Sequence, residues 1–273
     1  MVAVDPVALD GLLAATGPVA LGDGATLAPG TAADRLLNGV YLDVADPEQH
    51  DAFFAAAARA VFAALTRGAG GPDAVDALAR AAGEGRLLVW SAHDDEQALL
   101  APTVLSGALT REPGDTAVVG VYLNDGTEAK IGYYLDLDVR GVARECRADG
   151  SQLVDLELTL TNRAPVYAAA LPGYVTGGGA VVAPGTAQTN LLLYAPAGGA
   201  VEDVEVDGGP ARMTAQVHDG LAVAARTFDL APGQATHVRM TVRTGPQQAG
   251  PVVVRSTPLA RGTGRTELPT SCG

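Results

Sequence analysis

The sequence has almost no lysine, few cysteines and no long apolar run. Lys130 is the only lysine among 18 basic residues, which face 31 acidic residues and give a net charge of −13. Without a basic stripe the chain has nothing to neutralise a phosphate backbone, so we expect neither nucleic acid nor an anionic membrane as partner. No run of about 18 apolar residues and no signal-peptide layout occurs, so we expect no membrane insertion by this chain itself.

The motifs of common enzymes are also absent. The sequence contains no Gly-x-Ser-x-Gly elbow, no phosphate-binding glycine loop and no His-Glu-x-x-His segment. The four histidines, His50, His93, His218 and His237, are spread along the chain. We therefore assign no catalytic residue, no metal ligand and no cofactor to this chain, and an enzyme is the less favoured interpretation.

Cys146 and Cys272 are the two cysteines, and their separation excludes a Cys-x-x-Cys redox or zinc motif. They are candidates for one disulfide that would fix the C-terminal tail and indicate an oxidising compartment. Two unpaired thiols are the alternative. The sequence leaves both open.

The composition, 48% hydrophobic and 18% charged, is typical of a folded chain, and 273 residues suit two domains. We predict an α+β protein with three parts. Residues 1–113 form a mainly helical α/β domain, residues 114–257 an antiparallel immunoglobulin-like β-sandwich, and residues 258–273 a flexible tail.

Helix signals dominate the first part. Asp5-Pro6 and Asp46-Pro47 each combine a capping residue with a first-turn proline, and apolar residues after Asp46 recur at helical spacing until Gly68. Leu87–Trp90 is predicted to form a short buried strand. Ser91 and Asp94 then predict a capping box at the start of another helix.

From about residue 115 the pattern alternates between apolar and polar residues, as in Val154–Leu160 and Val238–Val242. Four Asp-Gly pairs favour tight hairpins: Asp125-Gly126, Asp149-Gly150, Asp207-Gly208 and Asp219-Gly220. These features predict a sandwich of short antiparallel strands. Residues 164–188, rich in proline and glycine, are predicted to form a long loop between the sheets.

Seven residues are candidates for ligand binding: Trp90, His93, Asn124, Lys130, Tyr133, Tyr134 and Tyr174. Lys130 is predicted to lie on a strand beside two tyrosines, where a cation and aromatic rings can hold a carboxylate or a sugar; core packing is the alternative. Tyr174 lies in the long loop, and such loops often carry recognition, although an aromatic there can also anchor the loop to the core.

His93 belongs to the acidic cluster His93-Asp94-Asp95-Glu96, which follows the strand that ends near Trp90. A metal or general-base role is conceivable for this cluster. Acids in a first helical turn that favour the helix dipole are the simpler interpretation. Asn124 belongs first of all to a predicted hairpin turn.

Several short segments, spread over most of residues 2–257, together carry a resemblance to a known family. They comprise Val2–Leu9, Gly17–Val19, Asp51–Phe54, Arg86–Ser91, Val121–Gly126 and Leu171–Gly177, with Lys130, Tyr133 and Tyr134. These segments resemble a largely actinobacterial family known only as domain of unknown function 4012. The resemblance implies a cell-envelope protein with a membrane helix ahead of this region, hence an extracytoplasmic location. A cytoplasmic location is expected instead if Met1 is the natural start.

The opening segment is also distantly similar to the LytR-CpsA-Psr family, which transfers glycopolymers from a polyprenyl pyrophosphate carrier to peptidoglycan. That family carries an arginine-rich pyrophosphate motif where this sequence has Tyr41–Asp43 and Glu48–Asp51, without arginine. Because pyrophosphate is bound by arginines or helix N-termini, this chain alone does not support that activity.

The leading hypothesis is a non-catalytic extracytoplasmic module of a bacterial cell-envelope protein that binds a glycan or another envelope protein. The alternative is one part of an envelope glycopolymer transferase or hydrolase whose active site lies in a missing front half. A purely structural cytoplasmic protein is a third interpretation, and it predicts reduced cysteines.

Overall fold

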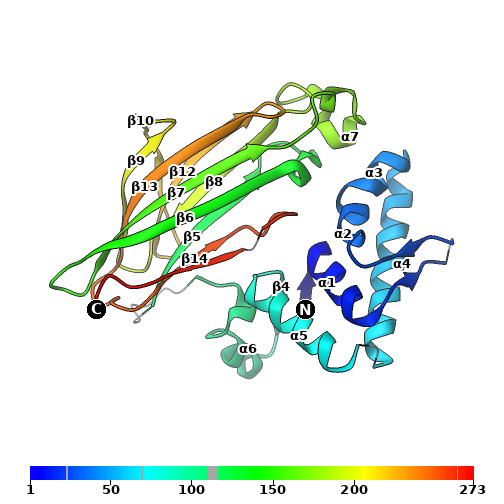
Figure 1. The fold of residues 1–273 in the computed structure, drawn as a ribbon, viewed down its shortest axis with the longest axis horizontal. Helices are drawn as coiled ribbons and strands as arrows, with labels where there is room; N and C mark the ends of the chain where they lie inside the picture. Colours follow the sequence, from blue (N-terminus) through cyan, green and yellow to red (C-terminus); the bar gives the residue numbers. More distant parts are fainter. Residues whose placement is uncertain (23, 69, 110–115, 263) are drawn as a thin grey trace. The chain divides into compact units, whose positions relative to one another are not determined.

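The computed structural model describes residues 1–273 except 23, 69, 110–115 and 263, and the chain divides into two compact units, Met1–Ala108 and Leu109–Gly273 (Figure 1). The first unit is mainly helical and the second is mainly β-sheet. This is the α+β composition that the sequence predicts. The predicted domain boundary between residues 113 and 114 lies outside the described residues.

The first unit combines helices with two small antiparallel ribbons, β1 with β4 and β2 with β3. Its elements are β1 (Val2–Val4), α1 (Pro6–Thr16), β2 (Val19–Ala20), β3 (Thr26–Leu27), α2 (Ala32–Asp34), a π-helical turn (Arg35–Gly39), α3 (Val40–Asp43), α4 (Pro47–Thr66), α5 (Gly71–Gly83), β4 (Leu87–Val89) and α6 (Asp94–Leu100). Within the described part of the chain, every helix falls short of the length and apolarity needed to cross a bilayer.

Aspartates cap two helices of the first unit, α1 and α4. The Asp5 carboxylate accepts a hydrogen bond from the Ala8 amide at 2.7 Å, and Asp46 caps α4 in the same manner, as predicted. The predicted capping box is wrong. His93 is the N-cap residue of α6, and the Ser91 hydroxyl instead accepts a hydrogen bond from the His93 amide at 3.2 Å.

A buried arginine fixes the start of the first unit. The Arg86 side chain is 2% exposed, and its guanidinium pairs with Asp5 at 2.6 Å and with Glu84 at 3.2 Å. The Asp5 amide also donates to the Arg86 carbonyl at 3.1 Å. These contacts join the N-terminus of α1 to the strand β4, and both guanidinium contacts are charge-assisted.

The second unit contains two sheets that enclose one shared core (Figure 1). Its strands are β5 (Ala117–Asp125), β6 (Leu135–Cys146), β7 (Gln152–Asn162), β8 (Ala187–Tyr194), β9 (Ala200–Val206), β10 (Gly209–Pro210), β11 (Thr214–His218), β12 (Leu221–Leu230), β13 (Ala235–Arg243), β14 (Val252–Ser256) and β15 (Arg265–Leu268). The five-stranded sheet has the order β10-β9-β13-β7-β6, and the six-stranded sheet has the order β11-β12-β8-β5-β14-β15.

The core follows the alternation read from the sequence. Leu156, Leu158 and Leu160 of β7 are at most 3% exposed, and the residues between them face outward. Val119 of β5 and Leu193 of β8 bring the six-stranded sheet into the same core. The alternation therefore predicts correctly which side of β7 and of β13 is buried.

The prediction of purely antiparallel strands is wrong for the six-stranded sheet, because β14 pairs with β5 in parallel. Val252 lies beside Ala117, and Ser256 lies beside Val121. Alternation defines which face of a strand is buried but says nothing about the direction of its neighbour. The finer immunoglobulin-like arrangement stays a prediction.

Three of the four predicted Asp-Gly hairpins are confirmed, since Asp149-Gly150, Asp207-Gly208 and Asp219-Gly220 each connect strands that pair antiparallel. Asp207 and Asp219 adopt positive φ angles of 50° and 57°, which the tightest hairpins require. Asp125-Gly126 is not a hairpin turn, because β5 and β6 belong to different sheets. The Asp125 carboxylate there accepts hydrogen bonds from the amide and the hydroxyl of Thr127.

The C-terminal residues differ from the flexible tail that we expected. Arg265–Leu268 forms β15 and pairs with β14, and Cys272 forms a disulfide with Cys146 at the end of β6. The two Cα atoms lie 5.0 Å apart, within the usual range for a disulfide. The structure therefore favours the disulfide over the two unpaired thiols that the sequence left open.

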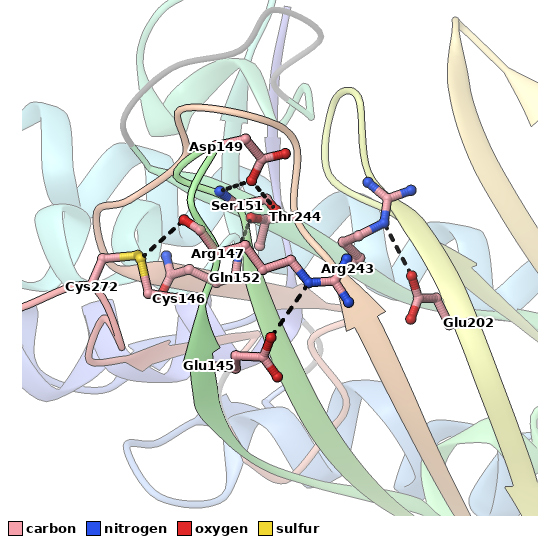
Figure 2. Close-up of polar contacts among 10 residues, drawn as sticks. All are labelled: Glu145, Cys146, Arg147, Asp149, Ser151, Gln152, Glu202, Arg243, Thr244 and Cys272. Carbon is pink, nitrogen blue, oxygen red and sulfur yellow. Dashed lines mark hydrogen bonds and ion pairs between the residues drawn. A yellow bond between two sulfur atoms is a disulfide. The ribbon is translucent and has the colours of Figure 1, made fainter.

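Gln152 lies near this disulfide (Figure 2). It is fully buried, and its side-chain amide bonds to two other segments. Its Nε2 atom donates to the carbonyls of Gln248 and Gly250, both at 2.8 Å. Its Oε1 atom accepts from the Thr270 hydroxyl at 3.1 Å and from the Ser271 amide at 2.8 Å. The start of β7, the segment before β14 and the C-terminus thus meet at one side chain.

Reduction of the disulfide is expected to destabilise the second unit. The cross-linked residues are separated by 126 positions, and loop-closure entropy for such a length gives up to about 5 kcal/mol of stabilisation. Guanidinium unfolding followed by far-UV circular dichroism, with and without reductant, measures this loss. Trp90, the single tryptophan, lies in the first unit, so its fluorescence transition should stay unchanged. Equal β-sheet midpoints in both conditions would contradict the expectation.

Replacing Gln152 by leucine should lower the free energy of unfolding of the second unit by about 3 kcal/mol or more, because two buried carbonyls and two donors lose their partner. The matched control is Gln188→Leu, which removes one exposed hydrogen bond to Asp229 and should change stability by less than about 0.5 kcal/mol. Urea denaturation of both variants provides the comparison. Similar losses in both would show that the buried bonds of Gln152 are not what stabilises this region.

Candidate functional site

Two connections of the second unit bring the predicted tyrosines and the lysine together. The short 3₁₀ helix Ile131–Tyr134 connects β5 to β6, and α7 (Gly173–Thr176) lies in the connection from β7 to β8. The Lys130 amide donates to the Val175 carbonyl at 3.1 Å, which joins the two connections directly. Lys130 therefore precedes a helical turn and does not lie on a strand, contrary to the prediction.

The Lys130 ammonium lies over the ring of Tyr174, 5.5 Å from its centroid. This distance is within the range of a cation–π interaction, in which the negative face of the ring attracts the charge. The Tyr174 ring comes from the long loop, and its side chain is 47% exposed. Two of the predicted residues, far apart in the sequence, thus form one contact.

A second cation–π pair lies one helical turn further along the chain. The rings of Tyr133 and Tyr134 meet edge to face, with centroids 4.9 Å apart. The guanidinium of Arg261 lies 5.2 Å from the centroid of Tyr133 and donates to the Tyr133 carbonyl at 3.1 Å. We call Lys130, Tyr133, Tyr134, Tyr174 and Arg261 the tyrosine–cation cluster.

The long loop is anchored to the core by residues other than Tyr174. Val175 and Ala168 are fully buried, and the buried Asn162 donates to the Gly185 and Leu230 carbonyls at 3.0 and 2.8 Å. These contacts hold the start and the end of the loop. The loop therefore has anchors besides any that Tyr174 provides, and the binding role of Tyr174 stays a prediction.

Sequence reasoning missed one member of the cluster and several exposed residues of the long loop. Arg261 lies in the segment that was predicted to be a flexible tail, so nothing in the sequence connected it to Tyr133. The long loop also exposes three more apolar side chains, Val166 at 95%, Tyr167 at 65% and Val181 at 61%. Exposure inside a loop has no periodic signal in the sequence, and only the packing of the loop reveals it.

The other predicted residues lie outside the tyrosine–cation cluster. Trp90 and His93 belong to the first unit, where the Trp90 amide donates to the Met1 carbonyl at 2.9 Å. Asn124 lies at the exposed end of β5, and its carbonyl accepts from the Thr189 hydroxyl at 3.2 Å. The acids Asp94, Asp95 and Glu96 occupy the first turn of α6, as the helix-dipole interpretation requires.

A charged depression of about 570 Å³ lies on the outer face of the five-stranded sheet. Its arginines are already paired with carboxylates, Arg144 with Asp155 at 2.8 Å and Arg239 with Glu157 at 3.0 Å. These ion pairs join neighbouring strands and stabilise the sheet, which accounts for the arginines in the depression. Among the described residues, no group of three or more His, Cys, Asp or Glu side chains is arranged to hold a metal ion.

Tyr122 and Asp149, both in the second unit, have shifted pKa values. Burial raises the pKa of Tyr122, and the charge of Arg255 opposes this shift. Hydrogen bonds from the hydroxyl and the amide of Ser151 lower the pKa of Asp149 in the β6–β7 hairpin. Each shift has a local structural cause, so neither indicates an acid–base site.

The comparison with the LytR-CpsA-Psr family concerned the region around Tyr41–Asp43. Arg35 forms an ion pair with Asp43 there, and its guanidinium lies 5.6 Å from the centroid of the Phe53 ring. The Arg35 guanidinium thus interacts with side chains of the protein itself, and it is not positioned to bind a pyrophosphate.

The family described as "Protein of unknown function (DUF4012)" matches residues 1–41 of the chain. This match supports a relationship to that family through the first unit. None of the curated proteins matches the chain at a significant level.

Solved structures resemble part of the chain only loosely. A proposed nutrient binding protein from Legionella pneumophila has a TM-score of 0.29 at 9% identity, and the match covers 52% of this chain and 49% of that protein. An M1 zinc metallopeptidase from Deinococcus radiodurans has a TM-score of 0.21 at 12% identity, covering 49% of this chain and 21% of the peptidase. The chain thus spans about half of the first protein and a fifth of the second, and neither likeness carries an argument about function.

Proposed function

We propose that this chain is a non-catalytic extracytoplasmic module of a bacterial cell-envelope protein and that it binds a glycan through the tyrosine–cation cluster. The observation that carries the proposal is the exposed ring of Tyr174, which pairs with Lys130 in a loop anchored by other residues. We retain the immunoglobulin-like arrangement of the second unit as part of this proposal, supported by its two sheets around one core.

The chemistry of the cluster suits a sugar. The C–H faces of a pyranose ring pack on the electron-rich face of a tyrosine, and cationic side chains donate hydrogen bonds to sugar hydroxyls or carboxylates. Lys130 and Arg261 place two cations beside two exposed or half-buried rings in a chain whose net charge is −13. This local reversal of charge favours a neutral or weakly acidic glycan.

Two observations support the envelope location. The disulfide between Cys146 and Cys272 is a bond that persists in oxidising compartments and is rare in a reducing cytosol. The match of residues 1–41 to the DUF4012 family agrees with the envelope proteins that the sequence resembles.

Replacing Tyr174 by alanine should weaken binding to cell-wall glycan about tenfold, because the ring supplies the stacking surface. The measurement is co-sedimentation with purified peptidoglycan and its attached polymers, followed by titration with oligosaccharides released from them. The matched control is Tyr167→Ala, which removes another exposed tyrosine from the same loop and should change the affinity less than twofold. Equal losses in both variants, or no binding by the wild type, would refute the glycan proposal.

The location has its own test. Intact-mass analysis under non-reducing conditions should find the Cys146–Cys272 disulfide in protein taken from its native host, in the envelope fraction. Reduced cysteines in a cytosolic product would remove the extracytoplasmic part of the proposal, whatever the glycan measurement gives.

A further inference from the structure

The outer faces of the two sheets in the second unit differ in charge. Residues that pair across strands point to the same side of a sheet, so the register identifies the side chains of one outward row. On the six-stranded sheet, Asn124 of β5, Asn190 of β8 and Thr227 of β12 form an uncharged row. On the five-stranded sheet, one outward row contains only charged side chains: Arg140, Glu157, Arg239 and Glu205.

The lack of charge extends over four strands of the six-stranded sheet. Among the outward residues of β5, β8, β11 and β12, all of which the structure describes, Asp229 is the only Asp, Glu, Lys or Arg. Its carboxylate accepts a hydrogen bond from Gln188 at 2.9 Å. In a chain with a net charge of −13, such a face is suited to an uncharged partner. We call six of its outward residues the neutral face: Tyr122, Asn124, Asn190, Leu192, Tyr194 and Thr227.

The neutral face places hydrogen-bonding groups beside apolar ones. The Asn190 Oδ1 atom accepts from the Thr227 hydroxyl, while the Asn190 Nδ2 atom and the side-chain amide of Asn124 make no hydrogen bond within the described residues. In the adjacent row Tyr122 pairs with Leu192, and the rings of Tyr122 and Tyr194 meet edge to face with centroids 5.7 Å apart. Sugar units carry hydroxyls around their rims and C–H groups on their ring faces, so they can use both rows.

The exposure of the apolar side chains favours a glycan over a protein as partner. Protein interfaces depend on a few large apolar side chains that fill pockets of the partner. Tyr122, Leu192 and Tyr194 are only half-buried by their neighbours and protrude less than Val166 and Tyr167 of the long loop. A glycan needs no protruding anchor, because hydrogen bonds and ring packing hold it on a shallow surface.

The neutral face is close to the tyrosine–cation cluster along the chain. Lys130 is six positions after Asn124, so the two Cα atoms lie at most about 21 Å apart. The Gly126 amide donates to the Gln188 carbonyl at 2.9 Å, which holds the start of this connection against β8. A polymer bound at Lys130 therefore needs to extend by no more than this distance to reach Asn124.

We propose that the ligand is an uncharged polysaccharide whose interior runs from the tyrosine–cation cluster onto the neutral face. The inference rests on the proposed glycan binding at that cluster, and it adds the class of glycan, a neutral chain of several sugar units. One part of the chain contacts Tyr174 and Lys130. The sugar units that follow bond through their hydroxyls to the side-chain amides of Asn124 and Asn190.

Oligosaccharides released from purified cell wall test this inference once they are sorted by size and, through anion exchange, by charge. Calorimetric titration should show an affinity about tenfold higher for neutral fragments of about six sugar units than for neutral fragments of about two, because only the longer ones extend beyond the cluster. Acidic fragments of about six units should bind more weakly than neutral ones of the same size.

The double variant Asn124→Ala/Asn190→Ala removes two hydrogen-bonding side chains from the neutral face. It should reduce the affinity ratio between long and short neutral fragments from about tenfold to less than about threefold. The matched control is Thr161→Ala, which removes an outward hydroxyl from β7 of the five-stranded sheet and should keep the ratio of the wild type. Far-UV circular dichroism of both variants checks that the sheets are intact.

The outcomes separate this inference from the glycan proposal on which it rests. Equal affinity for short and long neutral fragments, or a preference for acidic ones, overturns the inference and leaves glycan binding at the cluster intact. A tenfold ratio that survives in Asn124→Ala/Asn190→Ala overturns it as well, because the chain then follows another path. Binding of no fragment refutes glycan binding itself and the inference with it. An envelope protein that loses binding to the double variant, while the glycan does not, would assign the neutral face to that protein.

Discussion

The side-chain amide of Gln152 connects the start of β7 to the segment before β14 and to the C-terminal segment. A fully buried amide is tolerated only when its donors and acceptor are satisfied, and here both N–H groups and the oxygen have partners. Those partners lie before β14 and near the C-terminus. The disulfide joins the same C-terminal segment to β6, so a covalent bond and a hydrogen-bond network act together on one end of the unit.

The sequence predicted local features of the fold better than long-range ones. The capping aspartates Asp5 and Asp46 and the alternation in β7 depend on neighbouring residues, and the structure confirms them. The parallel pairing of β14 with β5 depends on the path of the chain, for which no local pattern exists. Asp10 shows the same limit, because its carboxylate accepts a hydrogen bond from the Ala32 amide at the start of α2, 22 residues further along the chain.

The sequence predicted only some members of the tyrosine–cation cluster, and the reason is physical. A lone lysine beside Tyr133 and Tyr134 is visible in the sequence, and the structure pairs that lysine with Tyr174 of the long loop. Arg261 escaped prediction because its partner ring lies in a distant part of the sequence. Trp90 and His93 were grouped with these residues as candidates, although they belong to a separately packed unit.

The parallel contact between β5 and β14 also determines when the second unit can form. β5 opens this unit and β14 lies near its end, yet the two strands are neighbours inside one sheet. Pairings between distant parts of a chain are slow to form, because their loop-closure entropy must be overcome before any contact compensates for it. As the ribosome extends the chain, the edge of β5 that pairs with β14 has no partner strand until Val252–Ser256 has been synthesised.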